Sequence, residues 1–446
     1  MASPPASASD TTVSRRTLLG AAAAAGLGGS ATARVPGASG QFLWGAATAA
    51  HQIEGGNVAS DYWVLEHTPA TYFKEPSGDA CDSWHRWRED LALVRAGGMN
   101  AYRFSVEWAR VEPERGEFSR ASLEHYRQLV TTARERDIEP VVTLHHFTSP
   151  RWIAAQGGWE NSQTVDAFAR YVERVVQFLG ADVRWYCTMN EPNAQVTSKV
   201  MALDKPWDQE PKILAQAARA VSSERWGSYF LGNPYRVRDV CLLAHARART
   251  AIRAIVPGAR VGLTLALQQM SAGPGGDALY RRVWEETRLP FYEAAKADDF
   301  IGIQTYNRGR TGPSGYLPNE NPTMVNAWGQ DSSPEALAAV AVEAHRATGR
   351  PVLVTENGIQ TDDDAQRIIH LRRSVDGLFA RIAEGLPLLG YIHWSLLDNF
   401  EWSSGYTPRF GLVAVDRTTF ARRPKPSLYA YRDLIAATRR RSPLLL

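Results

Sequence analysis

The stretch WYCTMNEPN, residues 185–193, is an aromatic and apolar run that ends at a carboxylate, Glu191. A second stretch, PVLVTENGI at residues 351–359, has the same form, with β-branched residues before Glu356. Each run is typical of a buried strand that ends where the chain leaves the core. A single acid at such a point usually has only a structural role. These two acids lie far apart in the sequence, so they can act together only if the fold closes on itself.

Short apolar or β-branched runs recur along the whole chain, and helical patterns separate them. Residues 122–137 and 164–180, for example, carry apolar side chains at the spacing of one helix face. Strands that alternate with helices predict a parallel sheet, and eight of them predict a single closed (β/α)₈ barrel, the TIM barrel of the α/β class. The expected strands span residues 42–48, 101–108, 140–147, 185–192, 260–267, 300–306, 351–358 and 389–397.

The composition is that of an ordinary globular protein. The chain has 446 residues, 44% of them hydrophobic and 22% charged, so it can bury a large core, and disordered and fibrous classes are excluded. Its formal net charge of +3 is small for this length and gives no electrostatic basis for binding nucleic acid. The three cysteines, Cys81, Cys187 and Cys241, are too few and too scattered for a disulfide framework or a thiolate metal site. Cys187 falls inside an expected strand and is expected to pack in the core.

The first 33 residues resemble a twin-arginine export signal rather than part of the fold. Arg15 and Arg16 precede a weakly apolar stretch rich in Ala and Gly, and a small-x-small cleavage site ends at Ala33. We therefore expect a signal peptide at residues 1–33 and one barrel domain at residues 34–446, with the mature protein secreted or held in the cell envelope. No other apolar stretch approaches the length of a membrane span.

In a closed barrel of this kind the active site is built at the C-terminal ends of the strands. Two acids among amides, a histidine and aromatic side chains fit glycoside hydrolysis, in which one carboxyl protonates the leaving oxygen and the other attacks the sugar or activates water. Any one of these residues alone would more often be structural, but their convergence on one rim favours a site. The residues within, at or just past the expected strand ends are Gln52, Arg103, His146, Asn190, Glu191, Tyr306, Glu356, Trp394, Glu401 and Trp402.

The neighbouring pair His145 and His146 suggests a metal enzyme as an alternative. Successive side chains of a strand point to opposite faces of the sheet, so these two imidazoles cannot ligate one ion together. Gly26, Gly28 and Gly29 follow no expected strand, so they do not form a nucleotide-binding loop. We therefore expect neither a metal ion nor a cofactor.

Five stretches of the chain resemble the motifs of glycoside hydrolase family 1, the retaining β-glycosidases typified by β-glucosidases. They occur in the order found in the family, and the similarity extends over about residues 41–435, nearly the whole mature chain. Several long motifs in the right order make the resemblance specific. The stretches are FLWGAATAAHQIEG (42–55), YRFSVEWARVEP (102–113), TMNEP (188–192), TENGI (355–359) and WSLLDNFEWSSGYTPRFGLVAVD (394–416).

The resemblance implies a role for each candidate residue. Glu191 would be the general acid/base and Glu356 the nucleophile of a double displacement. Arg103 and Tyr306 would hold the Glu356 carboxylate and keep it ionised, whereas Glu191, desolvated and repelled by Glu356, would start protonated. The sugar would be bound by Gln52, His146, Asn190 at the 2-hydroxyl, Tyr306, Trp394 as a stacking floor, Glu401 as an ionised ligand of the 4- and 6-hydroxyls, and Trp402.

The chain departs from the family pattern at several positions. Phe147 stands where the family usually has Trp, Gln304 where it has Asn, and His51 where Tyr is common. Residues 198–239 lack the usual pattern of that region. These departures leave the exact sugar and the leaving group open.

A small-molecule β-glycoside or oligosaccharide is the expected partner, and two other functions remain open. A transglycosylase would use the same glycosyl-enzyme intermediate, with an alcohol in place of water as the acceptor. A sugar-binding protein without catalysis is the second, although such a relative typically lacks one of the two acids, and here both Glu191 and Glu356 are present. The sequence does not determine the oligomeric state.

Overall fold

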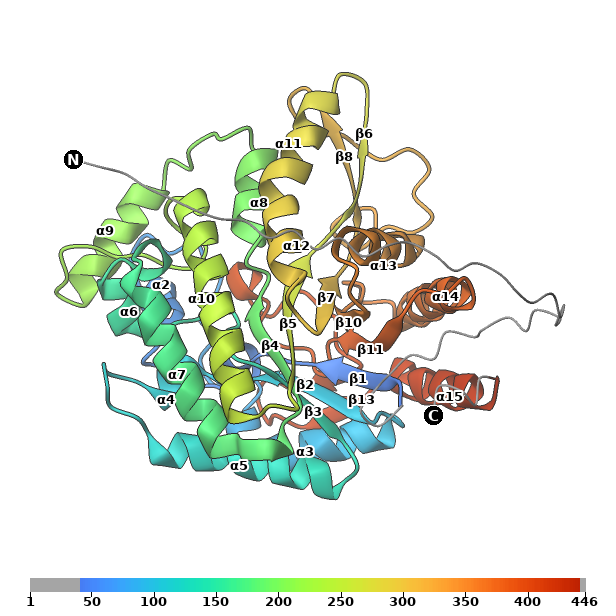
Figure 1. Ribbon diagram of the computed structural model, residues 1–446, viewed down its shortest axis with the longest axis horizontal. Coiled ribbons are helices and arrows are strands. Elements are labelled where there is room, and N and C mark those ends of the chain that lie inside the picture. Colours follow the sequence, from blue (N-terminus) through green and yellow to red (C-terminus); the bar gives the residue numbers. More distant parts are fainter. Residues whose placement is uncertain (1–40, 442–446) are drawn as a thin grey trace, which may run out of the picture. The chain divides into compact units, whose positions relative to one another are not determined.

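The structure, a computed structural model, describes residues 41–441. The expected signal peptide at residues 1–33 lies outside the described residues, as do both ends of the expected domain at 34–446. Eight parallel strands pair in a closed ring in the order β1-β11-β10-β7-β5-β4-β3-β2, which confirms the expected barrel (Figure 1). These strands are β1 (Leu43–Ala47), β2 (Ala101–Ser105), β3 (Glu139–Thr143), β4 (Trp185–Asn190), β5 (Arg260–Ala266), β7 (Phe300–Gln304), β10 (Val352–Glu356) and β11 (Leu388–Trp394).

Several strands end earlier than the sequence pattern predicts. The pattern extends two of them to residues 108 and 147, whereas β2 ends at Ser105 and β3 at Thr143. Trp108 begins a short helix, α4 (Trp108–Val111), and His146 lies in a loop. Both residues are buried. The apolar pattern continues past the strand ends because apolar residues indicate burial rather than strand pairing. The loops at the mouth of the barrel are buried, but they do not pair as strands.

Side chains of the strands alternate between two apolar cores. Trp185 and Phe300 belong to the cluster that fills the barrel, whereas Phe104 and Tyr186 pack in the layer between the strands and the helices. This alternation is the two-residue period of a strand. Both faces of the parallel sheet are buried, so its strands read as nearly continuous apolar runs. Cys187 is buried in the barrel cluster with a free thiol, which confirms its expected place in the core.

Helices follow the strands and cover the outside of the barrel (Figure 1). In α7, apolar residues such as Phe168, Val172 and Val176 recur at helical spacing and are buried, so the helix presents one apolar face inward. The remaining helices are α1 (Ala50–Ile53), α2 (Asp61–Glu66), α3 (Ser83–Ala96), α5 (Arg120–Glu135), α6 (Arg151–Ala155), α7 (Gln163–Leu179), α8 (Ala194–Met201), α9 (Glu210–Ala220), α10 (Pro234–Ile255), α11 (Asp277–Thr287), α12 (Leu289–Ala295), α13 (Glu335–Thr348), α14 (Asp364–Ala383) and α15 (Pro426–Arg441), with short 3₁₀ turns η1 (Gly158–Glu160), η2 (Gly180–Asp182) and η3 (Trp402–Ser404).

Two small sheets lie outside the barrel. One joins β6 (Gln269–Ala272), β8 (Arg308–Gly312) and β9 (Gly315–Tyr316), and the other is the antiparallel pair of β12 (Val413–Val415) and β13 (Arg422–Pro424). In the first, a Cβ at Gly309 would clash with the Met270 sulfur and the Gln268 side chain. These atoms are the ends of flexible side chains, so a larger residue at 309 would require Met270 and Gln268 to shift.

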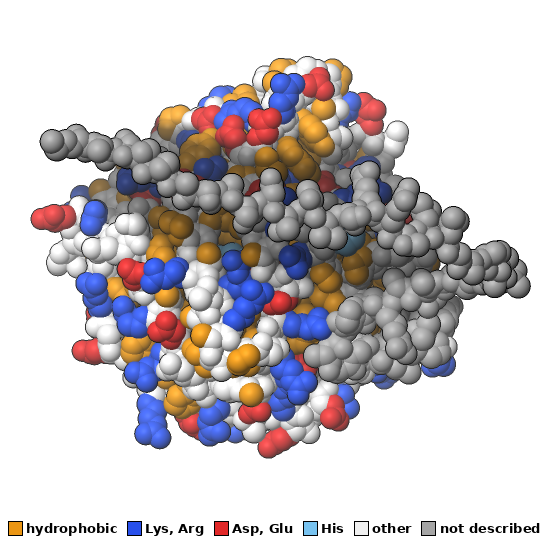
Figure 2. Space-filling model, in the orientation of Figure 1, with side chains coloured by type: hydrophobic (Ala, Val, Ile, Leu, Met, Phe, Trp, Pro, Cys, Tyr) orange, Lys and Arg blue, Asp and Glu red, His pale blue; other side chains and the backbone are white. Residues whose placement is uncertain are grey.

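The described surface is mixed in charge. Lys and Arg side chains are interspersed with Asp and Glu over the described part of the face seen in Figure 2. This distribution accords with the small formal net charge of +3. Within residues 41–441, no helix combines the length and the apolar character needed to cross a membrane.

A buried ion pair fastens the C-terminal hairpin to α3. Arg422 Nε donates to Asp90 Oδ1 over 2.9 Å, and Arg422 Nη2 donates to Asp90 Oδ2 over 3.2 Å. Both side chains are 1% exposed. The Ser83 hydroxyl donates to Asp90 and accepts from Arg422. Such a pair is stable away from water only while both partners are present and hydrogen-bonded.

We predict that Arg422→Met lowers the free energy of unfolding by about 3–5 kcal/mol, because it leaves the Asp90 charge buried without a partner. Arg423→Met is the matched control. Arg423 pairs with Asp416 at the surface with its side chain 71% exposed, and an exposed pair contributes at most about 1 kcal/mol. Urea denaturation of the two variants measures the difference. Equal, small losses would show that the buried pair contributes little.

Candidate active site

A buried arginine connects three strands at the mouth of the barrel. Arg103, in β2, is 0% exposed, and its Nη1 donates to Glu356 Oε1 over 2.5 Å. Its Nη2 donates to Asn190 Oδ1 over 2.6 Å. Glu356 is the last residue of β10 and Asn190 the last of β4, so one guanidinium fixes both strand ends relative to β2. The sequence predicted that Arg103 holds Glu356, but it did not predict the bond to Asn190.

Two further side chains donate to the Glu356 carboxylate. Tyr306 OH donates to Oε2 over 2.6 Å, and Gln304 Nε2 donates to Oε1 over 2.9 Å. Gln304 Nε2 also lies 2.7 Å from Asn190 Oδ1, while Gln304 Oε1 is buried without a partner in the described part of the chain. In the sequence, Gln304 stands out only as a departure from the family pattern. Its position two residues before Tyr306, at the end of an expected strand, was the signal that could have identified it.

The segment that carries Asn190 and Glu191 is held at the end of β4 by hydrogen bonds. Glu191 has a left-handed backbone, with φ at 48°, and its N–H donates to the Thr264 carbonyl over 2.9 Å. Tyr229 OH donates to the Asn190 carbonyl over 3.0 Å. A positive φ at a residue other than Gly costs free energy and persists where the surroundings enforce it. Asn190 Oδ1 already accepts from Arg103, Gln304 and, over 3.5 Å, Thr264, so the Nδ2 amide is the group that can bind a ligand.

The surroundings of Glu356 and Glu191 affect the pKa values of the two carboxyls differently. Burial raises the pKa of Glu356, and the Arg103 charge and the hydrogen bonds from Tyr306 and Arg103 offset only part of that rise. Burial and then the charge of Glu356 raise the pKa of Glu191 to about 8, against an opposing effect of Arg103. No side chain in residues 41–441 donates a hydrogen bond to the Glu191 carboxyl. Three donors favour the ionised form of Glu356, so Glu191 is the weaker acid of the pair.

Gln52 reaches the mouth from α1, directly after β1. Its Nε2 donates to Asn399 Oδ1 over 2.9 Å and to the Phe400 carbonyl over 2.8 Å, both in the loop after β11. Its Oε1 is buried and has no partner among the described residues. Leaving a buried acceptor unpaired costs about 1–3 kcal/mol, which a ligand hydroxyl would offset. Gln52 can therefore accept one hydrogen bond from a sugar.

A set of rings lines the mouth beside these groups. His146 lies 5.8 Å from Trp394 and 6.0 Å from Trp402, with 21° and 15° between the ring planes. Phe147 packs edge-on against Trp402 at 5.0 Å. Burial lowers the pKa of His146 well below its usual range, so its imidazole is neutral and can both donate and accept. The rings offer flat apolar faces next to polar groups, a combination that suits a pyranose.

Glu401 lies within reach of Trp394. Its Oε1 accepts from Trp394 Nε1 over 3.2 Å. Burial raises the pKa of Glu401 to about 8, although the Trp394 hydrogen bond lowers it. The sequence predicted an ionised carboxylate here, whereas in the unliganded protein this carboxyl is mainly protonated at neutral pH. The physical reason is that burial removes the carboxyl from water, and the hydrogen bonds from Trp394 and Asn399 offset only part of that loss.

His51, another departure from the family pattern, belongs to a buried hydrogen-bonded network. Its ring lies parallel to Trp402, with 5.8 Å between centroids, and its Nε2 lies 2.8 Å from Glu66 Oε1. Burial alone would lower the pKa of His51, but the Glu66 carboxylate raises it overall. Asn57 Nδ2 lies 2.9 Å from His51 Nδ1, and Ser77 donates twice to Glu66. The network fixes the ring that supports Trp402.

Residues 198–239, which lack the family pattern, supply part of the wall. Phe230 packs against Phe147 at 4.7 Å, and Tyr229 does so at 5.8 Å. Trp207 is 41% exposed and contacts Tyr72. Tyr229 and Phe230 could not be identified from the sequence, because they lie in a loop without a periodic pattern.

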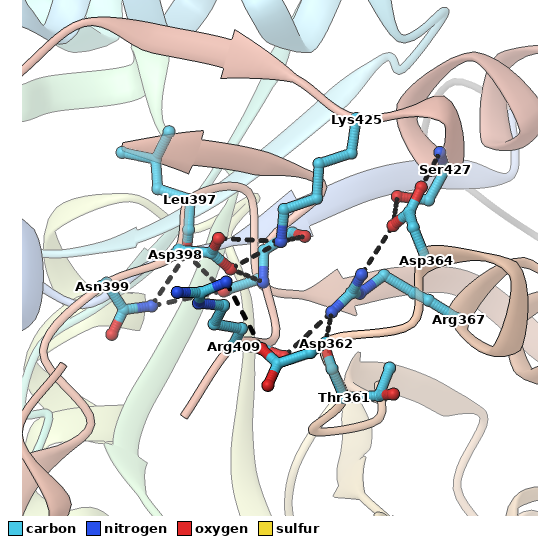
Figure 3. A network of polar contacts seen from close by, with 12 residues as sticks. Thr361, Asp362, Asp364, Arg367, Leu397, Asp398, Asn399, Arg409, Lys425 and Ser427 are labelled. Atoms are coloured by element: carbon cyan, nitrogen blue, oxygen red, sulfur yellow. Dashed lines mark hydrogen bonds and ion pairs between the residues drawn. The ribbon is translucent and has the colours of Figure 1, made fainter. Parts of the chain in front are cut away.

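A network of polar contacts holds the loop after β11 in place (Figure 3). Asp398 accepts from Lys425 Nζ over 2.8 Å. Arg367, in α14, is 1% exposed and donates to two loop carbonyls. Asn399 directly follows Asp398, so the network positions the oxygen that accepts from Gln52.

His145 and His146 have different surroundings. His145 Nε2 lies 3.0 Å from Ser149 Oγ, and its ring packs against Trp159 at 4.8 Å. His146 instead packs against Trp394. Within the described chain, no group of three or more His, Cys, Asp or Glu side chains is arranged to hold a metal ion.

Comparisons with known proteins identify relatives of this chain. The family model of glycosyl hydrolase family 1 matches residues 37–279 and 297–440. β-Glucosidase A of Thermotoga maritima is 30% identical, over 88% of this chain and 96% of that protein. Among solved structures, the β-glycosidase BGL167 has a TM-score of 0.85 at 45% identity, covering 89% of this chain and 96% of that one. The T. maritima β-glucosidase in complex with noeuromycin has a TM-score of 0.77 at 29% identity, covering 89% and 98%.

Three observations converge. The family model covers most of the chain, the fold is a closed barrel, and the acids of the TMNEP and TENGI motifs, Glu191 and Glu356, meet at its mouth, close enough for the charge of one to shift the pKa of the other. The chain therefore belongs to glycosyl hydrolase family 1, the family of retaining β-glycosidases.

Proposed function

We propose that the protein hydrolyses unphosphorylated β-glycosides of the β-glucosidase type, with Glu356 as the nucleophile and Glu191 as the general acid/base. The observation that carries the proposal is the unequal treatment of the two carboxyls. Three side chains donate to Glu356, whereas Glu191 has no donor in the described chain and a pKa of about 8. A relative in T. maritima is named a β-glucosidase, which supports a glucose-type sugar.

In the first step the Glu356 carboxylate attacks C1 of the sugar, and the bond from C1 to the leaving oxygen breaks. Glu191 transfers its proton to that oxygen, so the leaving group departs as a neutral alcohol. Arg103 and Tyr306 hold the attacking carboxylate in place. Asn190 Nδ2 donates to the 2-hydroxyl, a contact that strengthens in the transition state.

The second step reverses these roles. The glycosyl-enzyme is an ester at Glu356, so the negative charge that raised the pKa of Glu191 has gone, and Glu191 stays ionised more readily. Glu191 takes a proton from water, the water oxygen attacks C1, and the bond from C1 to Glu356 breaks. Two inversions at C1 give net retention, and both carboxyls regain their starting protonation.

The remaining candidates bind the sugar. Gln52 Oε1 accepts from one sugar hydroxyl. His146 and Trp402, whose rings are stacked 6.0 Å apart, contact the same sugar. Trp394 is the floor of the pocket. Glu401, protonated before the sugar binds, can donate one hydrogen bond and accept others from the 4- and 6-hydroxyls.

The two catalytic roles can be separated by mutation. Glu356→Gly should abolish hydrolysis, and azide should restore turnover as an α-glycosyl azide, because the anion enters from the vacated face. Glu191→Ala should keep the first step on aryl glycosides with good leaving groups, which need little protonation. NMR identifies the anomers formed. Exchanged phenotypes would reverse the assignment, and an α-anomer as the first wild-type product would contradict retention.

Gln304→Leu should shift the pH profile on one side only. The reaction needs Glu356 ionised, so activity falls as the pH drops through the pKa of Glu356, and it needs Glu191 protonated, so activity falls as the pH rises through about 8. Removing the Gln304 donor destabilises the ionised form of Glu356, so the acid limb of kcat/KM should move up by about one pH unit. Gln304→Asn keeps an amide and is the control. An unmoved acid limb in Gln304→Leu would contradict a role for this contact.

Glu401→Ser should lower kcat/KM for an unphosphorylated glycoside by at least about tenfold, since one hydrogen bond to the substrate is lost. The wild type should hydrolyse a 6-phosphorylated glycoside about a thousandfold more slowly than its unphosphorylated counterpart. A phosphate there would lose its water next to the Glu401 carboxyl, which holds its own proton, and residues 401–411 contain no lysine to pair with the phosphate. Unchanged kinetics of Glu401→Ser, or faster cleavage of the phosphorylated substrate, would contradict this assignment.

We also propose that residues 1–33 direct export by the twin-arginine route and are then removed. The paired arginines, the weakly apolar stretch and the cleavage site occur together and in order. The described chain needs no disulfide for its fold, because Cys81, Cys187 and Cys241 are buried with free thiols. The mature enzyme would then act outside the cytoplasm.

Changing both Arg15 and Arg16 to Lys keeps the positive charge but removes the paired arginines. The precursor should then remain in the cytoplasm, which cell fractionation and the size of the protein reveal. A single change of Arg34 to Lys, beyond the expected cleavage site, is the control and should leave export unaffected. Normal secretion of the double variant would contradict the twin-arginine route.

A further inference from the structure

A line of buried hydrogen bonds connects α10 to β4 on the helix side of the barrel wall. His245, in α10, has its Nδ1 2.7 Å from Thr188 Oγ1 and its Nε2 3.0 Å from Asp298 Oδ1. Arg249, one turn further along α10, donates from Nη1 to Asp298 Oδ1 over 2.6 Å and lies 3.2 Å from His245 Nε2. Thr188, His245 and Asp298 are each at most 1% exposed. The line ends on β4 shortly before Glu191.

The partners of His245 determine the direction of its hydrogen bonds. A carboxylate only accepts hydrogen bonds, and Asp298 forms an ion pair with Arg249, so His245 Nε2 carries a hydrogen and donates it to Asp298. In the neutral ring Nδ1 is then an acceptor, and the Thr188 hydroxyl donates to it. Asp298 therefore fixes His245, and His245 fixes the Thr188 side chain.

β4 carries an extra residue at the point where His245 reaches it. The register between β4 and β5 shifts between Cys187 and Asn190, so Thr188 and Met189 together stand opposite a single residue of β5. Such a β-bulge disrupts the ladder locally, bends the strand and changes the direction of the side chains that follow. Bulges are frequent beside active sites for this reason. Here the residue that follows the strand is Glu191.

Side chains hold both strands at the bulge. Asp298 Oδ2 accepts from the N–H of Leu263, the β5 residue opposite the bulge, over 3.0 Å. Thr264 Oγ1 donates to the Met189 carbonyl over 3.0 Å. Thr188 is therefore held from α10, and Met189 is held from β5.

A threonine, a histidine and an aspartate in series also have the hydrogen-bond order of a hydrolase triad. A nucleophile must reach its substrate, whereas Thr188 is fully buried. Its hydroxyl contacts a helix outside the barrel, while Cys187 before it faces the barrel interior. Thr188 is therefore not a second nucleophile, and its hydroxyl holds β4.

The Glu191 carboxyl depends on its backbone more than the Glu356 carboxyl does. Three side chains donate to Glu356, whereas none in residues 41–441 donates to the Glu191 carboxyl. Glu191 also has a positive φ of 48°, which persists only where the surroundings enforce it. A shift at the end of β4 would therefore displace the acid and leave the nucleophile in place.

We propose that Thr188 and His245 are positioning residues for the general acid/base Glu191. Their hydrogen bond fixes the bulge, and the bulge sets the direction in which Glu191 leaves β4. A displacement of about 1 Å at a catalytic group can lower a rate about a hundredfold, so breaking this bond should weaken proton transfer to the leaving oxygen. The inference rests on the proposed role of Glu191 and adds what holds that acid in place.

Two glucosides with different leaving groups test the inference. Thr188→Val removes the hydroxyl and keeps the branched shape. It should lower kcat/KM for phenyl β-glucoside by about tenfold or more, because phenolate needs a proton to depart. For 2,4-dinitrophenyl β-glucoside the loss should be less than about threefold, because this leaving group needs little protonation. Release of the two phenols measures both rates.

Two further threonine variants are the controls. Thr188→Ser keeps a hydroxyl at the same place and should restore the wild-type ratio of the two rates. Thr348→Val removes a buried hydroxyl elsewhere: Thr348, in α13, is 5% exposed, and its Oγ1 donates to the Ala344 carbonyl over 2.7 Å. It should leave the ratio unchanged, so a general loss of stability is separated from a displaced acid.

His245→Gln tests the other end of the bond. The glutamine amide can still reach Asp298 but no longer accepts from Thr188, so the same unequal losses are expected. The double variant with Thr188→Val should be no worse than the poorer single variant, because both changes break one hydrogen bond. If the melting temperature shows that Thr188→Val does not fold, the losses of His245→Gln decide alone.

Equal losses on the two glucosides, no loss on phenyl β-glucoside, or losses that add in the double variant would overturn this inference and leave the proposed function standing. A wild type that cleaves neither glucoside would overturn the proposed function, and this inference with it.

Discussion

The contact of the Arg103 guanidinium with Glu356 and Asn190 is the interaction on which the mouth of the barrel depends. A guanidinium without exposed surface is stable only if carboxylate and amide oxygens replace its water, and without them it would cost several kcal/mol. The hydrogen bonds that stabilise the buried guanidinium also fix the ends of β4 and β10. The positions of Glu356 and Asn190 are therefore set by paired strands, which are more rigid than loops.

A difference of one residue at the strand ends accounts for the contrast between the two acids. β10 ends at Glu356, so this carboxyl is still directed by the strand toward Arg103. β4 ends at Asn190, and Glu191 follows with a positive φ. Asn190 thus takes the place next to the guanidinium, and Glu191 is left buried beside a like charge. The sequences TMNEP and TENGI are similar, but β4 ends one residue before its glutamate and β10 ends at its glutamate. Glu191 is therefore the weaker acid and Glu356 the stronger one.

The sequence was sufficient for the barrel, because burial on both faces makes every strand an apolar run. It was also sufficient for residues within the family motifs, such as Arg103 and Glu356. Strand ends were less predictable, since buried loops at the mouth look like strands. Gln304 was recognised as unusual but not as a donor to Glu356, because its contact depends on side-chain length in three dimensions. The raised pKa of Glu401 was not predictable either, because it follows from the burial of this carboxyl in the folded chain.

The seam of the barrel has a consequence for the nascent chain. β1 pairs with β11, and the Tyr431 hydroxyl near the C-terminus bridges the carbonyls of Gly45 and Tyr391 across that seam. During synthesis β1 therefore meets its second neighbour only after β11 has been made. Until then β1 has an unpaired edge, on which a strand of another molecule can add. The synthesis of β11 is thus the step at which one molecule pairs this edge itself and protects it from aggregation.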